Sequence, residues 1–438
     1  MNALPKSWTE TTLGAVIDYG KAEKVEPDAI ADDAWILELE DIEKDTSKII
    51  SRASFGERKS KSTKNRFYNG DVLYGKLRPY LNKVVVADAD GYCTTEIVPI
   101  TPTEVTDSRY VFYWLKHPRF LSYVTEVSHG LNMPRLGTDT GKAAPFVLAP
   151  LSEQTRIADK LDALLAHVDA ARGRLDCVPV LLKRFRQSVL TAATSGELTK
   201  EWRDGKKAEW RETDLQFVAQ VGTGSTPLRA NKSFYAEQGT PWITSAATSE
   251  RFVISAEEFV TADAIKAHRL KVYPAGTLLV AMYGEGKTRG QVTELAIPAT
   301  INQACAAVQV DEGRADRRYV RFVLEANYYA MRELAEGGNQ PNLNLTKVKE
   351  FPILIPPLDE QAEIIRRAEA LLAQADKVHV QYEAARSRVS KLTSALLTKA
   401  FRGELVPQDP QDEPASALLE RLQAAKASAQ KAMKQRRK

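Results

Sequence analysis

The sequence predicts an α+β protein in which two related mixed domains are separated by two long helices, packed as an intramolecular antiparallel coiled coil. Three observations lead to this fold class. A helical segment occurs twice at a fixed offset, each copy carries an apolar heptad pattern, and the segment before each copy mixes strand-like with helix-like runs.

The length and composition suit a soluble protein of several domains. The 438 residues exceed what one core usually organises, and 43% hydrophobic with 27% charged residues is ordinary for globular proteins. There is no apolar run long enough to span a membrane and no secretory signal at the start, so we expect a cytoplasmic protein. The cysteines and histidines are dispersed, which predicts neither a metal site nor a catalytic Cys/His group. A net charge of +4 allows an acidic partner without requiring one.

The repeated segment is helical and of fixed length. Residues 150–166 read PLSEQTRIADKLDALLA and residues 357–373 read PLDEQAEIIRRAEALLA, with nine identities and an offset of 207. The match continues without an insertion to Gly196 and Gly403, where each helix is expected to end. Because each added residue would lengthen a helix by about 1.5 Å and turn its end by about 100°, the gapless match indicates a constrained length.

Steps of three and four between apolar residues run through five heptads in each copy. This spacing predicts a seam between paired helices, formed by Ile157, Leu161, Leu164, Val168, Leu175 and Val178 in the first copy and Ile364, Leu371, Val378, Tyr382, Val389 and Leu392 in the second. Core packing in a bundle would explain one such stripe, but two copies at one offset favour two antiparallel helices of the same chain. Since the heptads continue past Pro179, we expect a kinked continuous helix there; two helices joined at residues 176–179 are the alternative.

The repeats divide the chain into five parts. We predict a first mixed domain at 1–148, a first helical region at 149–201, a second mixed domain at 202–355, a second helical region at 356–406, and a tail at 407–438 with a short helix near 415–431. The tail ends in basic residues, which either contact DNA or are simply solvated.

Basic and amide side chains gather in loops of both mixed domains. Loop lysines and arginines neutralise phosphates, and arginine, asparagine or glutamine can bond to base edges. A solvated charged loop explains any one of them equally well, but their recurrence after equivalent strands favours DNA contact. The candidates are Arg58, Lys59, Lys61, Lys64, Arg66, Lys76, Arg78, Asn82 and Lys83 in the first domain, and Lys287, Arg289 and Gln291 in the second.

Several segments carry a family resemblance over essentially the whole length. They are PLSEQTRIADKLDALLAHVD, LLKRFRQSVLTAATSGELT, PPLDEQAEII, LLTKAFRGELVPQ and DPQDEPASALLERLQ. On these segments the chain resembles the DNA-specificity subunit of type I restriction-modification systems, and LLKRFRQSVL after Pro179 is similar to the enterobacterial branch.

The resemblance implies a noncatalytic scaffold. The two mixed domains would be target-recognition domains, each reading one half of a bipartite double-stranded DNA sequence, and the helices would set the spacer between the halves. Two methyltransferase subunits would transfer a methyl group from S-adenosylmethionine to adenine N6, and two motor-nuclease subunits would use ATP and magnesium. This chain would bind no cofactor, no metal and no membrane. About 37 helical residues span roughly 55 Å, which exceeds the 34 to 36 Å of one DNA turn.

Two other functions stay open from the residues alone. A standalone DNA methyltransferase or nuclease would show turnover without partners. A coiled-coil assembly adaptor would lack DNA contact, and salt-dependent binding to duplex DNA would argue against it.

Overall fold

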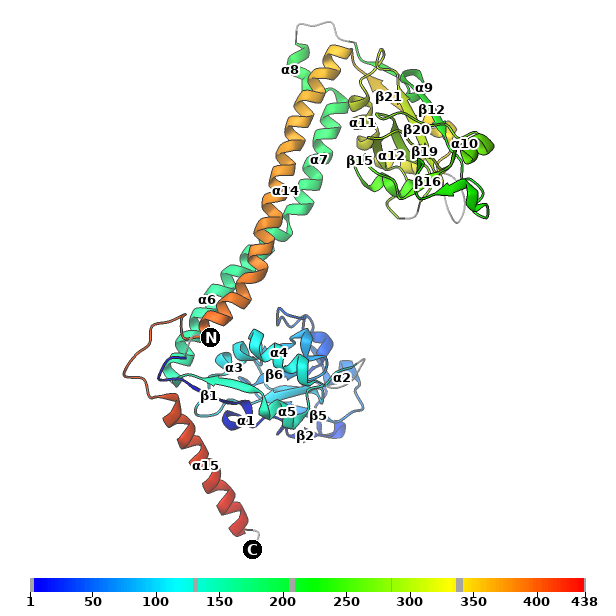
Figure 1. Ribbon diagram of the computed structural model, residues 1–438. Coiled ribbons are helices and arrows are strands. Elements are labelled where there is room, and N and C mark those ends of the chain that lie inside the picture. Colours follow the sequence, from blue (N-terminus) through cyan, green and yellow to red (C-terminus); the bar gives the residue numbers. More distant parts are fainter. Residues whose placement is uncertain (1–3, 129–132, 205–208, 285, 336–341, 437–438) are drawn as a thin grey trace. The chain divides into compact units, whose positions relative to one another are not determined.

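The computed structural model describes residues 4–128, 133–204, 209–284, 286–335 and 342–436 (Figure 1). The chain forms two compact units. The first unit comprises Met1–Asp176 and Ala384–Lys438, and the second unit comprises Cys177–Glu383. Each unit therefore combines a mixed α/β domain with segments of the long helices, and the first unit contains both ends of the chain.

The first unit contains a five-stranded and a three-stranded sheet beside short helices. The five strands follow the order β2 (Lys24–Val25), β5 (Lys64–Phe67), β8 (Gly91–Thr94), β3 (Trp35–Leu37) and β4 (Ala53–Ser54). The smaller sheet has the order β7 (Val84–Val86), β6 (Val72–Gly75) and β9 (Ile97–Ile100). The short helices of the first unit are α1 (Leu13–Val16), α2 (Phe55–Arg58), α3 (Ser108–Leu115), α4 (Pro118–Val127) and α5 (Thr138–Ala143). An antiparallel pair of β1 (Thr9–Thr12) and β10 (Pro145–Leu148) joins the beginning of the domain to its end.

The second unit repeats this plan with different strands. Its five-stranded sheet has the order β12 (Ala219–Thr223), β20 (Cys305–Val310), β17 (Leu278–Ala281), β18 (Val292–Leu295) and β15 (Phe252–Val253). The four-stranded sheet has the order β13 (Tyr235–Ala236), β16 (Glu258–Val260), β14 (Thr240–Ile243) and β19 (Thr300–Ile301). The helices are α8 (Lys200–Arg203), α9 (Leu215–Val218), α10 (Ala262–His268), α11 (Arg317–Ala326), α12 (Tyr328–Glu333) and α13 (Leu345–Lys349). As in the first unit, an antiparallel pair, β11 (Arg211–Asp214) with β21 (Pro352–Ile355), closes the domain.

Three long helices connect the domains: α6 (Leu151–Asp176), α7 (Val178–Ser195) and α14 (Leu358–Ala400). In the first unit, Leu397 and Ala400 near the end of α14 share a core with Ile157 and Leu161 near the start of α6. In the second unit, the end of α7 shares a core with the start of α14. In each unit the end of one helix packs against the start of another, so the pairing is antiparallel. The predicted fold class is confirmed.

Ten of the twelve predicted seam residues are buried or half-buried. Five seam residues are buried, namely Ile157, Leu161, Val168, Ile364 and Tyr382, and five are half-buried, namely Leu164, Leu175, Val178, Leu371 and Val389. Val378 and Leu392 are 45% and 42% exposed, so they are covered less than the other predicted seam residues. A straight helix drifts by about 20° per heptad away from a strict seven-residue repeat, which turns such positions toward solvent.

The helix around Pro179 is interrupted by a single residue. Helix α6 ends at Asp176 and α7 begins at Val178, while Cys177 between them keeps a right-handed helical backbone with φ −79° and ψ −23°. The amide of Leu181 still donates to the Cys177 carbonyl at 3.2 Å. Pro179 has no amide hydrogen, so it cannot donate the helical hydrogen bond to the carbonyl four residues before it. The expected continuous helix is therefore replaced by two helices that meet without a loop.

The tail forms a longer helix than expected, α15 (Ala415–Arg436). Leu418 and Leu422 are buried against Val105, and the Lys426 amine donates to the Ala15 carbonyl at 3.2 Å. The tail is thus a packed element of the first unit. Among the described residues, no helix is both long and apolar enough to cross a membrane.

Candidate nucleic-acid interface

A buried Glu-Gln pair in the first turn of α6 attaches the first recognition domain to the helix. The indole N–H of Trp8 donates to Glu153 at 2.8 Å. Gln154 accepts from the Asp107 amide at 2.9 Å and donates to the carbonyls of Ala149 and Val105 at 2.9 and 3.0 Å. Both side chains are at most 1% exposed. The pair therefore holds the start of the domain, its last strand and the N-terminus of α3 at one point.

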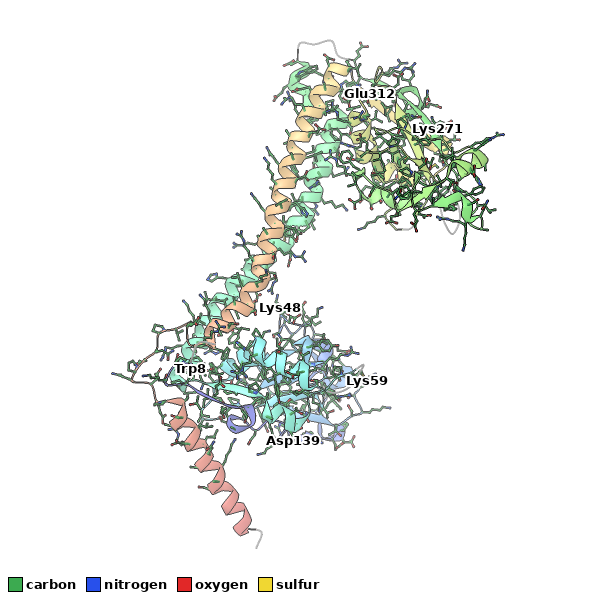
Figure 2. The ribbon with its side chains drawn as sticks, in the orientation of Figure 1. Trp8, Lys48, Lys59, Asp139, Lys271 and Glu312 are labelled. Atoms are coloured by element: carbon green, nitrogen blue, oxygen red, sulfur yellow. The ribbon has the colours of Figure 1, made fainter. Side chains whose placement is uncertain are left out.

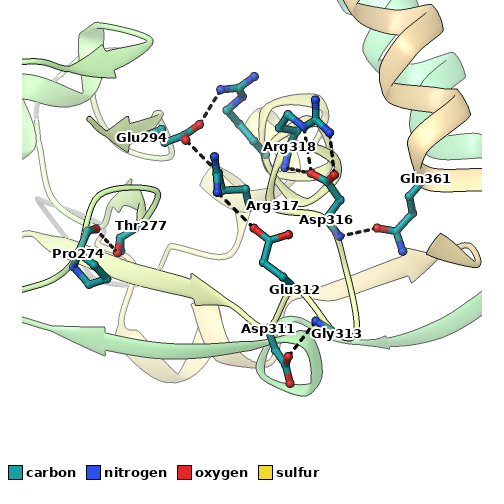
Figure 3. A network of polar contacts seen from close by, with 11 residues as sticks. Pro274, Thr277, Glu294, Asp311, Glu312, Gly313, Asp316, Arg317, Arg318 and Gln361 are labelled. Atoms are coloured by element: carbon teal, nitrogen blue, oxygen red, sulfur yellow. Dashed lines mark hydrogen bonds and ion pairs between the residues drawn. The ribbon is translucent and has the colours of Figure 1, made fainter. Parts of the chain in front are cut away.

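The second unit repeats the arrangement at the start of α14. Trp210 donates to Glu360 at 3.0 Å, and Gln361 accepts from the Asp316 amide at 2.7 Å and donates to the Pro356 carbonyl at 2.8 Å. Figure 3 shows the contact of Gln361 with Asp316, whose carboxylate accepts from the amide and guanidinium of Arg318 at the start of α11. We call these two sets of contacts the helix anchors.

The partners around the two anchor glutamates differ. Glu153 also accepts from Gln408 of the tail, and burial raises the pKa of its carboxyl although Trp8 and Gln408 donate to it. Glu360 instead accepts from the Thr199 hydroxyl at 2.7 Å and from Arg203 at 3.2 Å. In both units the residues that follow the glycine stop of one helix complete the anchor of the other helix.

In each domain, backbone hydrogen bonds fix the loop that follows a central strand, β6 in the first unit and β17 in the second. In the first unit the Leu136 amide donates to the Lys76 carbonyl at 3.0 Å, and the Arg78 amide donates to the Pro134 carbonyl at 2.7 Å. In the second unit the Leu343 amide donates to the Met282 carbonyl at 3.1 Å. Leu136 and Leu343 are both buried. The loops after β6 and β17 are therefore held from outside the hairpin.

The loop after β6 presents two side chains on a constrained backbone. A single 3-10 turn, Pro79–Leu81, is flanked by Arg78 at φ 50° and Asn82 at φ 49°. Left-handed conformations at non-glycine residues cost free energy and concentrate at functional sites. Arg78 and Tyr80 are exposed, Tyr80 by 51%, whereas Asn82 is buried. We call residues 78–82 the Arg78 turn; it holds a guanidinium and an aromatic ring outward.

Helix α12 fixes the corresponding loop of the second unit. Arg332 donates to the carbonyls of Arg289 and Gly286 at 2.7 and 2.8 Å, and the Tyr328 hydroxyl donates to the Lys287 carbonyl at 2.6 Å. All three bonds are accepted by backbone carbonyls of the loop, so they fix its backbone. Lys287 is exposed, while Gln291 lies 3.5 Å from the Thr248 hydroxyl.

Comparison with known proteins assigns the family. Residues 207–381 match the family model described as type I restriction modification DNA specificity domain. The chain is 29% identical over 343 residues to the type I restriction enzyme StySPI specificity subunit of Salmonella potsdam, covering 75% of this chain and 74% of that protein. It is 30% identical over 353 residues to the EcoDI specificity subunit of Escherichia coli, covering 72% of this chain and 76% of that protein. The chain belongs to the specificity subunits of type I restriction enzymes.

Solved structures share the fold of this specificity subunit. The HsdS subunit from Thermoanaerobacter tengcongensis has a TM-score of 0.63 at 20% identity, over 92% of this chain and 98% of that one. A chain from a study of complex assembly and conformational transition of the type I R-M system has a TM-score of 0.76 at 20% identity, over 92% of this chain and all of that one. The resemblance to the enterobacterial-like branch is confirmed, and so is the prediction of a specificity subunit in place of a free-standing enzyme.

Four of the loop residues predicted to contact DNA turn inward in this specificity subunit. Lys64 is 2% exposed, with its amine 3.4 Å from Glu38, and Arg58 binds Asp41 and Glu40. Lys83 donates to the Leu39 carbonyl at 2.6 Å, and Asn82 is 7% exposed. These side chains serve the first domain's own structure, which contradicts their assignment to DNA contact.

The other loop candidates stay predictions. Lys59, at the periphery of the first unit in Figure 2, Lys61 and Arg78 are exposed; Arg66 and Lys76 are half-buried, and Arg66 lies 3.7 Å from Glu23. Lys287, Arg289 and Gln291 lie together in the loop held by α12. Within the described residues no cluster of histidine, cysteine, aspartate or glutamate is suited to hold a metal ion.

Sequence reasoning missed the helix anchors and Tyr80. The signal for the anchors was the Glu-Gln dipeptide, which occurs at the same position of both repeats. The first turn of a helix is usually exposed and tolerates many residues, so the same pair in both copies indicates a shared contact. Nothing in the sequence distinguished Tyr80 from other loop tyrosines, because its exposure depends on the backbone of the Arg78 turn.

Proposed function

We propose that this specificity subunit reads a bipartite sequence in double-stranded DNA, with one half-site contacted by each recognition domain. The observation that carries the proposal is the pair of helix anchors, because the same tryptophan, glutamate and glutamine bonds hold each of two divergent domains to a helix start. The two domains share this attachment to the helix and differ in their loops, which supports two recognition domains of one architecture that read different sequences. DNA in the cytoplasm would be the target.

We further propose that the helices set the distance between the half-sites. Helix α14 is continuous over 43 residues, which corresponds to roughly 65 Å at 1.5 Å per residue. Its two ends belong to the two units, since Ile364 packs in the core of the second unit and Ala400 packs in the core of the first. A helix resists changes in length, so the number of nonspecific base pairs would follow the number of helical residues.

The chemistry would reside on partner subunits. Two methyltransferase subunits would bring S-adenosylmethionine for adenine N6 methylation, and two motor-nuclease subunits would bring ATP and magnesium. Support comes from the internal repeat, which offers two related surfaces to two copies of one partner, and from relatives that are named as subunits of type I restriction enzymes.

Domain exchange in the assembled methyltransferase tests the proposal. Residues 1–148 are replaced by those of a relative with another target, and the methylated adenines of the host genome are sequenced. We expect one half-site to change while the other half and the spacer persist; exchange of residues 202–355 should change only the opposite half. A change in both halves, or in neither, would contradict modular reading.

A further inference from the structure

A cavity of about 810 Å³ lies in the second unit between the recognition domain and helix α7. Its walls come from α7, the segment that follows β14, the loop after β17 with helix α12 behind it, and helices α11 and α14. These walls carry Lys183, Arg186, Arg251, Lys287, Tyr329 and Arg332, among others. The cavity thus adds a helical wall to the loop that was predicted to contact DNA.

The cavity is electropositive. Five basic side chains line it against two acidic ones, Glu250 and Glu325. Glu325 is half-buried and lies 3.6 Å from the guanidinium of Arg321, and burial raises the pKa of its carboxyl. Arg186 is paired with Asp376 at 2.7 Å, while Lys183 and Lys287 are exposed on different walls. The lysines are therefore available to an anion that enters the cavity.

The internal repeat shows that these charges are not needed for helix packing. At the offset of 207, buried Leu190 corresponds to buried Leu397, so the contact of the helix with its own recognition domain is retained. Lys183 corresponds to Ser390, and Arg186 corresponds to Thr393. Because the same packing is achieved without positive charge in the first unit, the basic wall of α7 has another purpose.

We propose that this cavity receives the phosphodiester backbone of the DNA duplex beside the half-site read by the second recognition domain, with Lys183 and Lys287 contacting phosphate oxygens. The inference rests on the proposed function and deepens it, because it makes helix α7 a direct DNA contact. Basic groups that come from separate elements suit a polyanion that crosses the cavity. Such contacts position the duplex and do not distinguish bases.

The decisive variant is Lys183→Ser, which introduces the serine found at the equivalent position of the second repeat, Ser390. DNA affinity of the assembled methyltransferase is measured between 50 and 200 mM salt on duplexes with intact or scrambled half-sites. Loss of one phosphate contact makes the slope of log affinity against log salt less steep by about 0.9. The ratio of wild-type to variant affinity should then shrink roughly 3.5-fold over this range, on both duplexes, with the methylated sequence unchanged.

Two further variants make the result specific. Lys183→Gln keeps the aliphatic stem of the side chain and should change the slope equally, so a packing defect of the serine variant would be recognised. Lys266→Ser removes an exposed lysine of α10 that does not line the cavity, and it should keep the full slope.

The outcomes separate the two proposals. An unchanged slope for both Lys183 variants, with bipartite methylation intact, would overturn the cavity proposal and leave the proposed function standing. A second outcome would also overturn the cavity proposal. If the cavity bound adenosine monophosphate saturably, if Lys183→Ser abolished this binding, and if the DNA slope stayed unchanged, the cavity would be a site for a small nucleotide. If the wild-type assembly methylated no bipartite sequence, the proposed function itself would fail.

Discussion

Trp8 donates its indole N–H to a carboxylate oxygen of Glu153 across 2.8 Å, a bond between residues 145 positions apart. Trp210 and Glu360 repeat this relationship over 3.0 Å in the second unit. Both glutamates lie in the first turn of a long helix and are at most 1% exposed. A buried bond at a helix start fixes where the recognition domain sits along its helix, so the anchors are positioning elements for DNA reading.

Replacing Gln361 with alanine should loosen the second domain locally. The variant leaves the Asp316 amide and the Pro356 carbonyl without their buried partner, at a cost of about 2 kcal/mol. Amide hydrogen exchange in residues 311–326 should accelerate by roughly 30-fold, as that free energy implies. The matched control is Gln374→Ala, an exposed glutamine of the same helix, which should not change the exchange. Equal acceleration in both variants would argue against the anchor.

His117 should make the first unit less stable in mild acid. Its Nδ1 accepts from the Arg119 amide at 3.1 Å as the cap of α4, and burial lowers the pKa of the imidazole from 6.5 to about 4. The folded state therefore binds fewer protons than the unfolded state between these values, so stability from this group is present above pH 6.5 and lost as pH falls toward 4. The loss should amount to about 1 to 3 kcal/mol.

His117→Asn keeps a capping side chain and removes the titration. Urea unfolding of the first unit, followed between about pH 4 and 7, should show a weaker pH dependence for this variant than for the wild type. His167→Asn, at an exposed position of α6, controls for the loss of a histidine. If wild type and His117→Asn lost stability in parallel over this range, the cap would not be the titrating element.

Arg78→Ala should relax the sequence read by the first domain. The Arg78 turn holds its guanidinium outward on a constrained backbone, the geometry suited to a bidentate bond with a guanine edge. We expect a loss of about 1 to 3 kcal/mol of discrimination at one base pair of the first half-site, visible when methylated sites are sequenced. Lys61→Ala, at another exposed loop position, should weaken binding uniformly and preserve the sequence. Unchanged discrimination in the arginine variant would exclude base reading by this turn.

Lengthening both long helices should lengthen the spacer. A one-turn insertion near Thr191 would fall between buried Leu190 and Ala193, so the exposed positions after Arg174 and after Val380 are better sites. Four residues in each helix add about 6 Å, close to two base pairs. Sequencing of methylated sites should give both half-sites unchanged with a longer spacer, while insertion into α6 alone should abolish methylation. A constant spacer in the double insertion would contradict the role of the helices.

The repeat predicted the helical framework because helix periodicity is a local property of the chain. The offset of 207, the glycine stops and most of the apolar seam required only the sequence. Helix α14 departs from this pattern at Val378 and Leu392, where exposure depends on how far the apolar face has turned from its partner. The break at Cys177 depends on one backbone hydrogen bond that Pro179 cannot make.

The loop residues were harder to predict because their roles depend on neighbours distant in sequence. Lys64 and Arg58 are basic residues in a basic stretch, yet carboxylates of residues 38–41 bind them inside the domain. Conversely, LLKRFRQSVL indicated the family, while only the structure placed Lys183 and Lys287 in the lining of one cavity. Charge counts alone therefore do not separate residues that stabilise a domain from those that face a ligand.

The first unit is assembled from both ends of the chain. Its core requires Leu397, Ala400 and Phe401, and its anchor requires Gln408, whereas the second unit is one uninterrupted segment, Cys177–Glu383. During synthesis from the N-terminus, the domain translated first must therefore wait for residues 397–408 to leave the ribosome, and the domain translated second can complete its packing earlier. Truncation at the C-terminus thus removes support from the N-terminal half of the molecule.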